Sequence, residues 1–141
     1  MSHEYLNTRS SHPARDASIR SIEAVLKGDK QAWLDNFHAE ATVEDPVGVS
    51  PMDPEGKGHH GIDAIAAFWD NFIGPGSVRF HIRESFAAGN ECANVGTITT
   101  RSADGAVGRC ELVMVYKVDD EGKVLSLRAF WEVDEMMADF F

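Results

Sequence analysis

The side chain that points most directly to chemistry is a carboxylate in the stretch ATVEDPVGVS, residues 41–50. If this stretch begins as a β-strand, alternation places Asp45 on the same face as the apolar Val43, and Glu44 on the polar face. A carboxylate on an apolar face usually has a role, because its burial is costly. We therefore predict that Asp45 lines a pocket. The alternative is a turn acid that accepts hydrogen bonds from nearby backbone N–H groups before Pro46.

Other reactive side chains give weaker signals. His59 and His60 are adjacent, so their rings rarely reach one ion together, and no third ligand stands at a recognisable spacing. We expect both to be exposed loop residues near the mouth of a pocket, without a metal. Cys92 and Cys110 lack metal-ligand spacing and are expected to be free thiols in a reducing cytoplasm.

The composition narrows the class of partner. The 141 residues include 23 acids and 13 bases, a formal net charge of −10, which argues against nucleic acid or an anionic membrane surface. This length suits one domain with a core. No apolar run is long enough for a membrane span, and the polar start does not resemble a signal peptide. We expect a cytoplasmic protein whose ligand is a small molecule.

Helical periodicity dominates the first half of the chain. Pro13 opens a helical pattern, and the stretch KGD at 27–29 ends it with a glycine. Asp29 is placed to cap a short second helix. A third helix is expected over about residues 61–73, with Trp69 and Phe72 at core spacing.

Alternation dominates the second half, where four runs separated by turn signals read as strands. The third run places Leu112, Met114 and Tyr116 on its more apolar face, and the fourth places Leu127 and Trp131 together. Phe80 and Phe86 are expected to face the core from the first run. The predicted strands are 77–88, 91–102, 107–118 and 123–133.

Helices followed by an antiparallel meander predict an α+β fold, in which the helices cover one face of a curved sheet and enclose a pocket. Residues 1–12 are expected to form a flexible arm, residues 13–133 the single domain, and residues 134–141 a tail with apolar side chains.

Three pieces of the sequence together resemble a known family. The order of VEDPVG, IAAFWDNF and DDEGKVLSLRAFW is similar to that of the ketosteroid isomerase (steroid delta-isomerase) family, within the nuclear transport factor 2-like, or SnoaL-like, superfamily. The resemblance spans about residues 21–133. It implies a conical barrel, in which a curved, mostly antiparallel sheet wraps around an apolar pocket under three N-terminal helices. It also implies a homodimer, no cofactor and a hydrophobic, steroid-like ligand.

The resemblance assigns the role of base to Asp45, but neither of the family's two hydrogen-bond donors is present at its usual position. In that family a carboxylate moves a proton from the carbon beside a ketone to a carbon two positions away, while a tyrosine and a protonated aspartic acid stabilise the ketone oxygen. The two donor positions fall on Ser21 and Met114. Met114 cannot donate a hydrogen bond. Tyr116, on the same strand face, is the expected substitute, and Ser21 or the indole N–H of Trp131 are weaker ones.

These observations leave three hypotheses open. Losing one oxyanion donor typically costs about 10²–10³ in rate, so the first is a weak steroid delta-isomerase with Asp45 and Tyr116 as its catalytic residues. The second is a steroid- or lipid-binding protein without turnover. The third is a cyclase or an epoxide hydrolase, although the predicted core faces lack the arginine of an Asp-Arg-Asp constellation. The expected substrate contacts are Ser21, Trp69, Phe80, Phe86, Leu112, Met114, Leu127 and Trp131.

Overall fold

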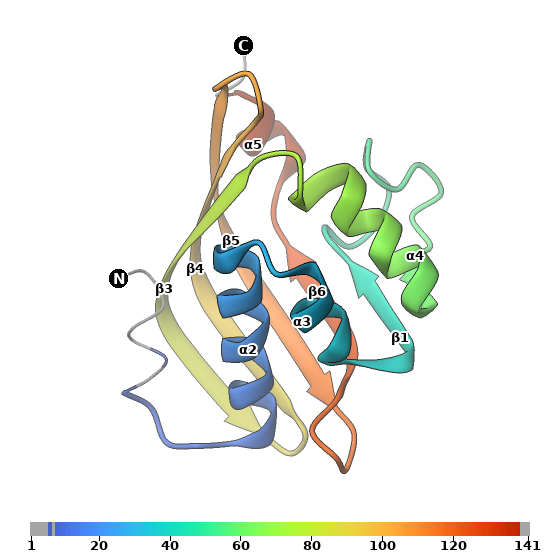
Figure 1. Ribbon diagram of the computed structural model, residues 1–141. Coiled ribbons are helices and arrows are strands. Elements are labelled where there is room, and N and C mark those ends of the chain that lie inside the picture. Colours follow the sequence, from blue (N-terminus) through green and yellow to red (C-terminus); the bar gives the residue numbers. More distant parts are fainter. Residues whose placement is uncertain (1–5, 7, 139–141) are drawn as a thin grey trace.

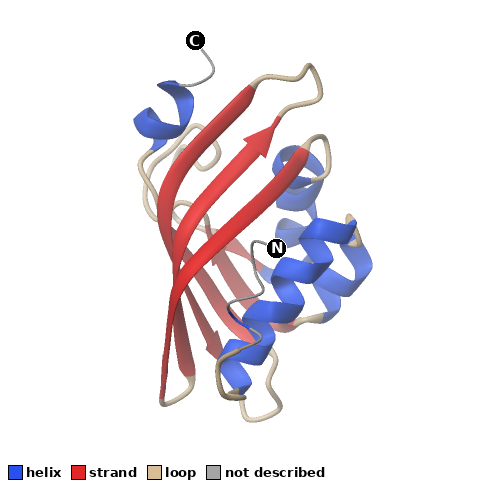
Figure 2. Ribbon diagram, turned by 90° about the vertical axis from the view of Figure 1, so that its left-hand side faces the viewer, coloured by secondary structure: helices blue, strands red, loops and turns tan. Residues whose placement is uncertain are grey.

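One curved sheet makes up the fold, with the helices of the first half of the chain on one side of it (Figures 1 and 2). The computed structural model describes residue 6 and residues 8–138. Its elements are α2 (Pro13–Lys27), α3 (Lys30–Asp35), β1 (Phe37–Glu44), β2 (His59–His60), α4 (Gly61–Phe68), the π-helical turn η1 (Trp69–Ile73), β3 (Ser77–Ala88), β4 (Glu91–Arg101), β5 (Val107–Val118), β6 (Val124–Phe130) and α5 (Val133–Ala138). None of the described helices is both long and apolar enough to cross a membrane.

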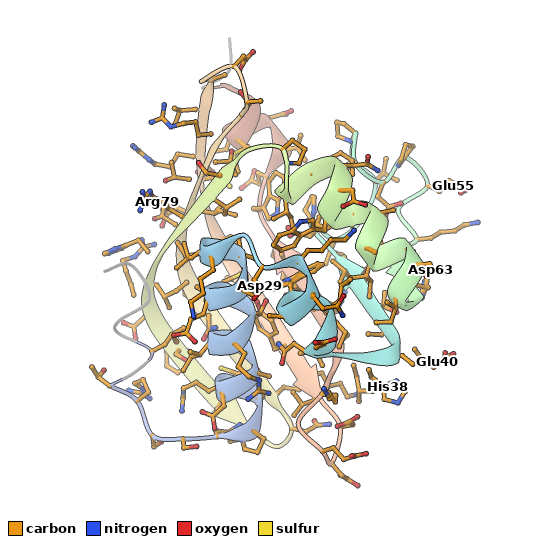
Figure 3. The ribbon with its side chains drawn as sticks, in the orientation of Figure 1. Asp29, His38, Glu40, Glu55, Asp63 and Arg79 are labelled. Atoms are coloured by element: carbon orange, nitrogen blue, oxygen red, sulfur yellow. The ribbon has the colours of Figure 1, made fainter. Side chains whose placement is uncertain are left out.

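The sheet has six strands in the order β2-β1-β6-β5-β4-β3, and it is not closed. All neighbouring strands are antiparallel except β1 and β6, which run parallel. Outward-facing charges on β1 and β3, such as Glu40 and Arg79, point away from the body of the molecule (Figure 3). The predicted α+β class and the curved sheet under N-terminal helices are confirmed.

Local sequence signals fix the two N-terminal helices. Pro13 begins α2, where its missing N–H costs no hydrogen bond, and Gly28 ends α2 in the left-handed conformation with φ of 67°. Asp29 caps α3 by accepting a hydrogen bond from the Ala32 backbone N–H at 3.0 Å. These predicted boundaries are confirmed, because each depends only on residues close by in the sequence.

The structure describes part of each chain end, and apolar side chains from both ends are buried. Leu6, predicted to lie in a flexible arm, is fully buried in the core. The predicted tail is partly the helix α5, whose Met136 is buried, while residues 139–141 lie outside the described residues.

The third predicted helix, expected over about residues 61–73, becomes π-helical from Trp69 onward. Its Phe72, predicted to lie in the core, is 42% exposed.

A buried polar network docks α2 on the sheet. Arg15 Nε donates to Ser85 Oγ on β3 at 3.0 Å, and Asn94 Nδ2 on β4 donates to Ser18 Oγ at 2.9 Å. Both helix residues are buried, so slipping the helix would leave polar groups without partners at a cost of about 1–3 kcal/mol each. The network thereby sets the height of Ser21, one turn further along α2.

A β-bulge in β3 reverses which residues face the core. Ile82 pairs with Gly96 and Glu84 with Val95, so one extra residue stands on β3 between these pairs. Beyond the bulge Ser85 is buried and Phe86 is 59% exposed. The prediction that Phe86 faces the core is therefore wrong. Because a bulge bends its strand, this one also contributes to the curvature of the sheet.

Gly96 gives a test of this packing. A Cβ atom at Gly96 would lie 2.1 Å from the His81 carbonyl oxygen, which belongs to the paired strand and has little freedom to move. We expect Gly96→Ala to lower the free energy of unfolding by roughly 2 kcal/mol or more, measured by urea denaturation. Thr99→Ala, on the same strand, is the matched control and should change the free energy of unfolding far less. Equal stability of Gly96→Ala and the wild type would contradict this account of the strand pair.

Candidate functional site

A cavity of about 320 Å³ lies between the helices and the concave face of the sheet. This volume is at the lower end of the range for small-molecule sites, about 300–1,000 Å³. The lining is mostly apolar, and it draws on α2, α3, α4, η1, four strands and α5. Among the lining residues only Asp45 and Arg101 carry a charge.

Eight of the ten residues predicted for the site line this cavity: Asp45, Tyr116, Ser21, Phe80, Leu112, Met114, Leu127 and Trp131. Phe86 faces outward because of the bulge in β3. Trp69 is buried behind the wall, where its ring packs on Trp33 at 5.3 Å. Sequence reasoning assigned neither Trp33 nor Met136 to the wall, and no local pattern distinguishes these two side chains from ordinary core residues.

Asp45 follows the last residue of β1 and lies in the cavity wall. Val43, two residues earlier on the same face, is fully buried. Trp131 Nε1–H donates to Asp45 Oδ1 at 2.6 Å. Alternation along β1 therefore indicated the direction of Asp45 correctly, and the Trp131 N–H is a donor to the carboxylate.

Burial raises the pKa of the Asp45 carboxyl above its ordinary value, because the charged form loses its hydration. The hydrogen bond from Trp131 and the nearby His59 act in the opposite direction, but burial has the larger effect. A carboxylate with a raised pKa is a stronger base than an exposed one, and this suits proton abstraction.

Three polar side chains meet deep in the cavity. Trp33 Nε1–H donates to Ser21 Oγ at 3.2 Å, and the Tyr116 hydroxyl donates to the same oxygen at 3.1 Å. The three side chains hold one polar hydrogen each, and two of these hydrogens are used inside the group. The hydrogen of Ser21 has no partner among the described residues, so it can be donated to a ligand.

The Tyr116 hydroxyl stays neutral at physiological pH. Burial raises the pKa of Tyr116, the bond to Ser21 lowers it by less, and the negative charge of Asp45 raises it further. Met114 is buried on the same face of β5, between Tyr116 and Leu112, and offers no polar hydrogen there. The Ser21–Tyr116 pair is therefore the hydroxyl donor group at this end.

His59 differs from expectation. Its ring packs against Phe68, which lines the cavity, with the ring centroids 4.8 Å apart, and its buried Nε2 has no hydrogen-bond partner among the described residues. His60 is exposed, with ring nitrogens near Thr42 Oγ1 and the Lys57 carbonyl oxygen, both at 2.9 Å. The prediction of two exposed loop histidines is therefore right about the exposure of His60 and wrong about that of His59, and both residues belong to the short strand β2 and not to a loop. Within the part of the chain that the structure describes, no three His, Cys, Asp or Glu side chains gather as a metal site would require.

The raised pKa of Asp45 predicts that this residue destabilises the fold at neutral pH. The folded protein holds the Asp45 proton more tightly than the unfolded chain does, so stability is lost as pH rises through the folded pKa. We expect Asp45→Asn to raise the urea midpoint at pH 7, and this gain to shrink as pH falls toward about 4. Asp120→Asn, in the exposed turn before β6, is the matched control. A lower midpoint for Asp45→Asn at pH 7 would contradict the desolvation of Asp45.

Several solved structures are similar to this chain in sequence and in fold. A ketosteroid isomerase from Mycobacterium sp. is 34% identical, over 89% of this chain and 98% of that one, with a TM-score of 0.85. A Mycobacterium tuberculosis protein in complex with estradiol-17β-hemisuccinate is 28% identical, over 89% and 98% of the two chains, with a TM-score of 0.82. A computationally designed 17-OHP binder is 27% identical, over 89% and 96%, with a TM-score of 0.84. The SnoaL-like domain matches residues 19–127, and this chain belongs to that family, with the nuclear transport factor 2-like fold.

Proposed function

We propose that this protein isomerises the double bond of a hydrophobic, steroid-like ketone without a cofactor. The observation that carries the proposal is a desolvated carboxylate, Asp45, in the same apolar cavity as a hydroxyl group with a hydrogen to spare. The ketosteroid isomerase among its structural neighbours supports this choice of reaction.

Each group has one task in the proposed reaction. Asp45 takes a proton from the carbon between the ketone and the double bond, and the electron pair moves onto the ketone oxygen to form a dienolate. Asp45 then returns the proton two carbons further along, so no atom is gained or lost. Trp131 Nε1–H holds the carboxylate in place during both transfers.

The Ser21–Tyr116 pair stabilises the dienolate oxygen. In the described arrangement Tyr116 donates to Ser21, and the free O–H is that of Ser21. If the two hydroxyls exchange roles, the free O–H is that of Tyr116. Either way the pair offers one hydrogen bond, and a low-dielectric cavity makes that bond stronger than it would be in water. With Met114 in the wall, we expect slow turnover.

This proposal predicts a specific pattern of activity. With a β,γ-unsaturated 3-ketosteroid, the conjugated enone should appear in ultraviolet absorbance, and Asp45→Asn should abolish it. Ser21→Ala and Tyr116→Phe should each cost about tenfold, because the remaining hydroxyl still donates. The double variant should lose roughly 10²–10³, the usual cost of an oxyanion donor.

The matched control is Trp69→Phe, since Trp69 is buried but outside the cavity wall. It should keep most of the activity. If Asp45→Asn turns over the steroid as fast as the wild type, the role of Asp45 is wrong.

A second candidate is a steroid-binding protein without turnover, and Met114 is the observation that favours it. Met114 offers no hydrogen bond to a dienolate oxygen, but its side chain can contact an apolar ring of the ligand. Submicromolar steroid binding without enone formation would select this candidate. An epoxide hydrolase is less well supported, because Asp45 is the only acid among the described residues of the cavity wall.

We also propose a homodimer formed through the outer face of the sheet. Phe86, Ala93 and Val115 are aligned across β3, β4 and β5, and Val95, Val113 and Phe130 across β4, β5 and β6. Phe86 and Phe130 are 59% and 42% exposed. An apolar patch across four strands is typical of an interaction site, and its matching surface on a second copy would bury it.

Sedimentation should test this association. The wild type is expected to sediment as a dimer, and Phe86→Asp combined with Phe130→Asp as a monomer. Val49→Asp is the control, because Val49 is 75% exposed in a loop away from the sheet. A monomeric wild type, or a double variant that remains dimeric, would contradict the proposed interface.

A further inference from the structure

We propose that the cavity has a second polar subsite around Thr100, which binds an acceptor oxygen at the end of the ligand opposite the ketone. This inference rests on the proposed function and specifies its substrate: a steroid-like ring system that carries a side chain ending in an oxygen. The cavity contacts that support it lie on β4, on the segment after β4, on β3 and on α5.

Thr100 and Tyr116 lie in separate parts of the cavity wall. Thr100 on β4 pairs with Gly108 on β5, and Tyr116 lies eight residues further along β5. At the usual rise of a strand, eight residues correspond to a contour of roughly 26 Å. The sheet is curved, so the straight distance between Thr100 and Tyr116 is shorter than this contour, and a ligand whose ketone lies at Tyr116 meets Thr100 with its opposite end.

The hydroxyl of Thr100 has only a weak partner. Thr100 and Ile98 both line the cavity, as expected for alternate residues on the inner face of β4. The Thr100 hydroxyl donates to Met136 Sδ at 3.5 Å, and a thioether is a weak acceptor. A ligand oxygen would be a better acceptor, so exchanging the sulfur for it is favourable.

Two other polar residues of the cavity lining lie beside Thr100. Ser77, at the start of β3, pairs with Arg101, and Ser102 directly follows β4, where its hydroxyl also bonds within its own turn. Along the inner faces between this end and Tyr116 the lining is apolar, with Phe80, Ile98, Leu112 and Met114. Separate polar ends with an apolar middle set both the orientation and the length of a ligand.

Charge at this end permits either a neutral or an anionic oxygen. Arg101 lines the cavity next to Thr100, and its side chain makes no ion pair or hydrogen bond with any described residue. In a protein of net charge −10, an arginine without an ion-pair partner in the described part of the chain offsets the repulsion of a carboxylate locally. The shared chemistry of the ligand end is therefore an acceptor oxygen, whether hydroxyl or carboxylate.

Four ligands and two variants test the subsite in the full chain. The ligands are 3-oxochol-4-en-24-ol, 3-oxochol-4-en-24-oic acid, cholest-4-en-3-one with its hydrocarbon side chain, and testosterone, which has no side chain. Thr100→Val removes the hydroxyl and keeps the shape of the side chain. Thr99→Val, at the neighbouring position of β4 that does not line the cavity, is the matched control. Affinity is measured by calorimetry.

We expect Thr100→Val to weaken binding of the alcohol and the acid by roughly three- to tenfold, the loss of one hydrogen bond. Binding of cholestenone and testosterone should stay unchanged, and Thr99→Val should affect none of the four. A stronger loss for the acid than for the alcohol would assign the subsite to carboxylates.

The remaining outcomes overturn the inference in distinguishable ways. If Thr100→Val weakens all four ligands equally, Thr100 contributes packing and not recognition. If testosterone binds and the side-chain ligands do not, or if Thr100→Val changes nothing, the subsite is wrong while the proposed function stands. If none of the four ligands binds the wild type, both the subsite and the proposed function are wrong.

Discussion

The rest of the site depends on the desolvation of one carboxylate. Asp45 stands where β1 ends, in a wall of apolar side chains, and one of its oxygens accepts the N–H of Trp131. The parallel pairing of β1 with β6 makes this contact possible, because it aligns Glu44 with Arg128 and brings the chain after β6 beside Asp45. On the outer face the Arg128 and Glu44 side chains pair at 3.1 Å, which supports the same register. An exposed pair of this kind contributes little alone, so the backbone pairing carries most of the alignment.

The position of the Ser21–Tyr116 pair also depends on contacts outside the cavity. Ser21 lies on α2 and Tyr116 on β5, and the hydrogen bond between their hydroxyls links the helix to the sheet in the cavity wall. Neither side chain could hold the 3.1 Å contact if α2 slid along the sheet. The buried bond from Asn94 to Ser18 resists that movement, because Asn94 is paired with Met114, two residues from Tyr116. A polar network outside the cavity thus positions the donors within it.

How far the sequence predicts this structure depends on the distance over which each signal acts. Helix ends at Gly28 and Asp29 were predicted correctly, since a left-handed glycine and a side-chain cap involve only neighbouring residues. Asp45 was placed correctly because β1 is regular up to that point. Phe86 was misplaced, because a bulge opposite Gly96 depends on two strands that no single stretch reveals. The contact of His59 with Phe68 could not be predicted either, because the two-residue strand that holds His59 exists only by pairing with the distant strand β1.

The proposed chemistry follows from a balance between the apolar wall and the donors. A buried tyrosine with a raised pKa is a weaker acid than a tyrosine in water, so its hydrogen bond to a dienolate is weaker. The surrounding apolar side chains strengthen every electrostatic interaction in the cavity, and this offsets part of the deficit. They also favour the binding of a neutral, hydrophobic ketone over that of its charged intermediate. In the proposed reaction a site of this composition therefore favours binding of the ligand over its turnover, and Met114 contributes to that balance by leaving its part of the wall without a donor.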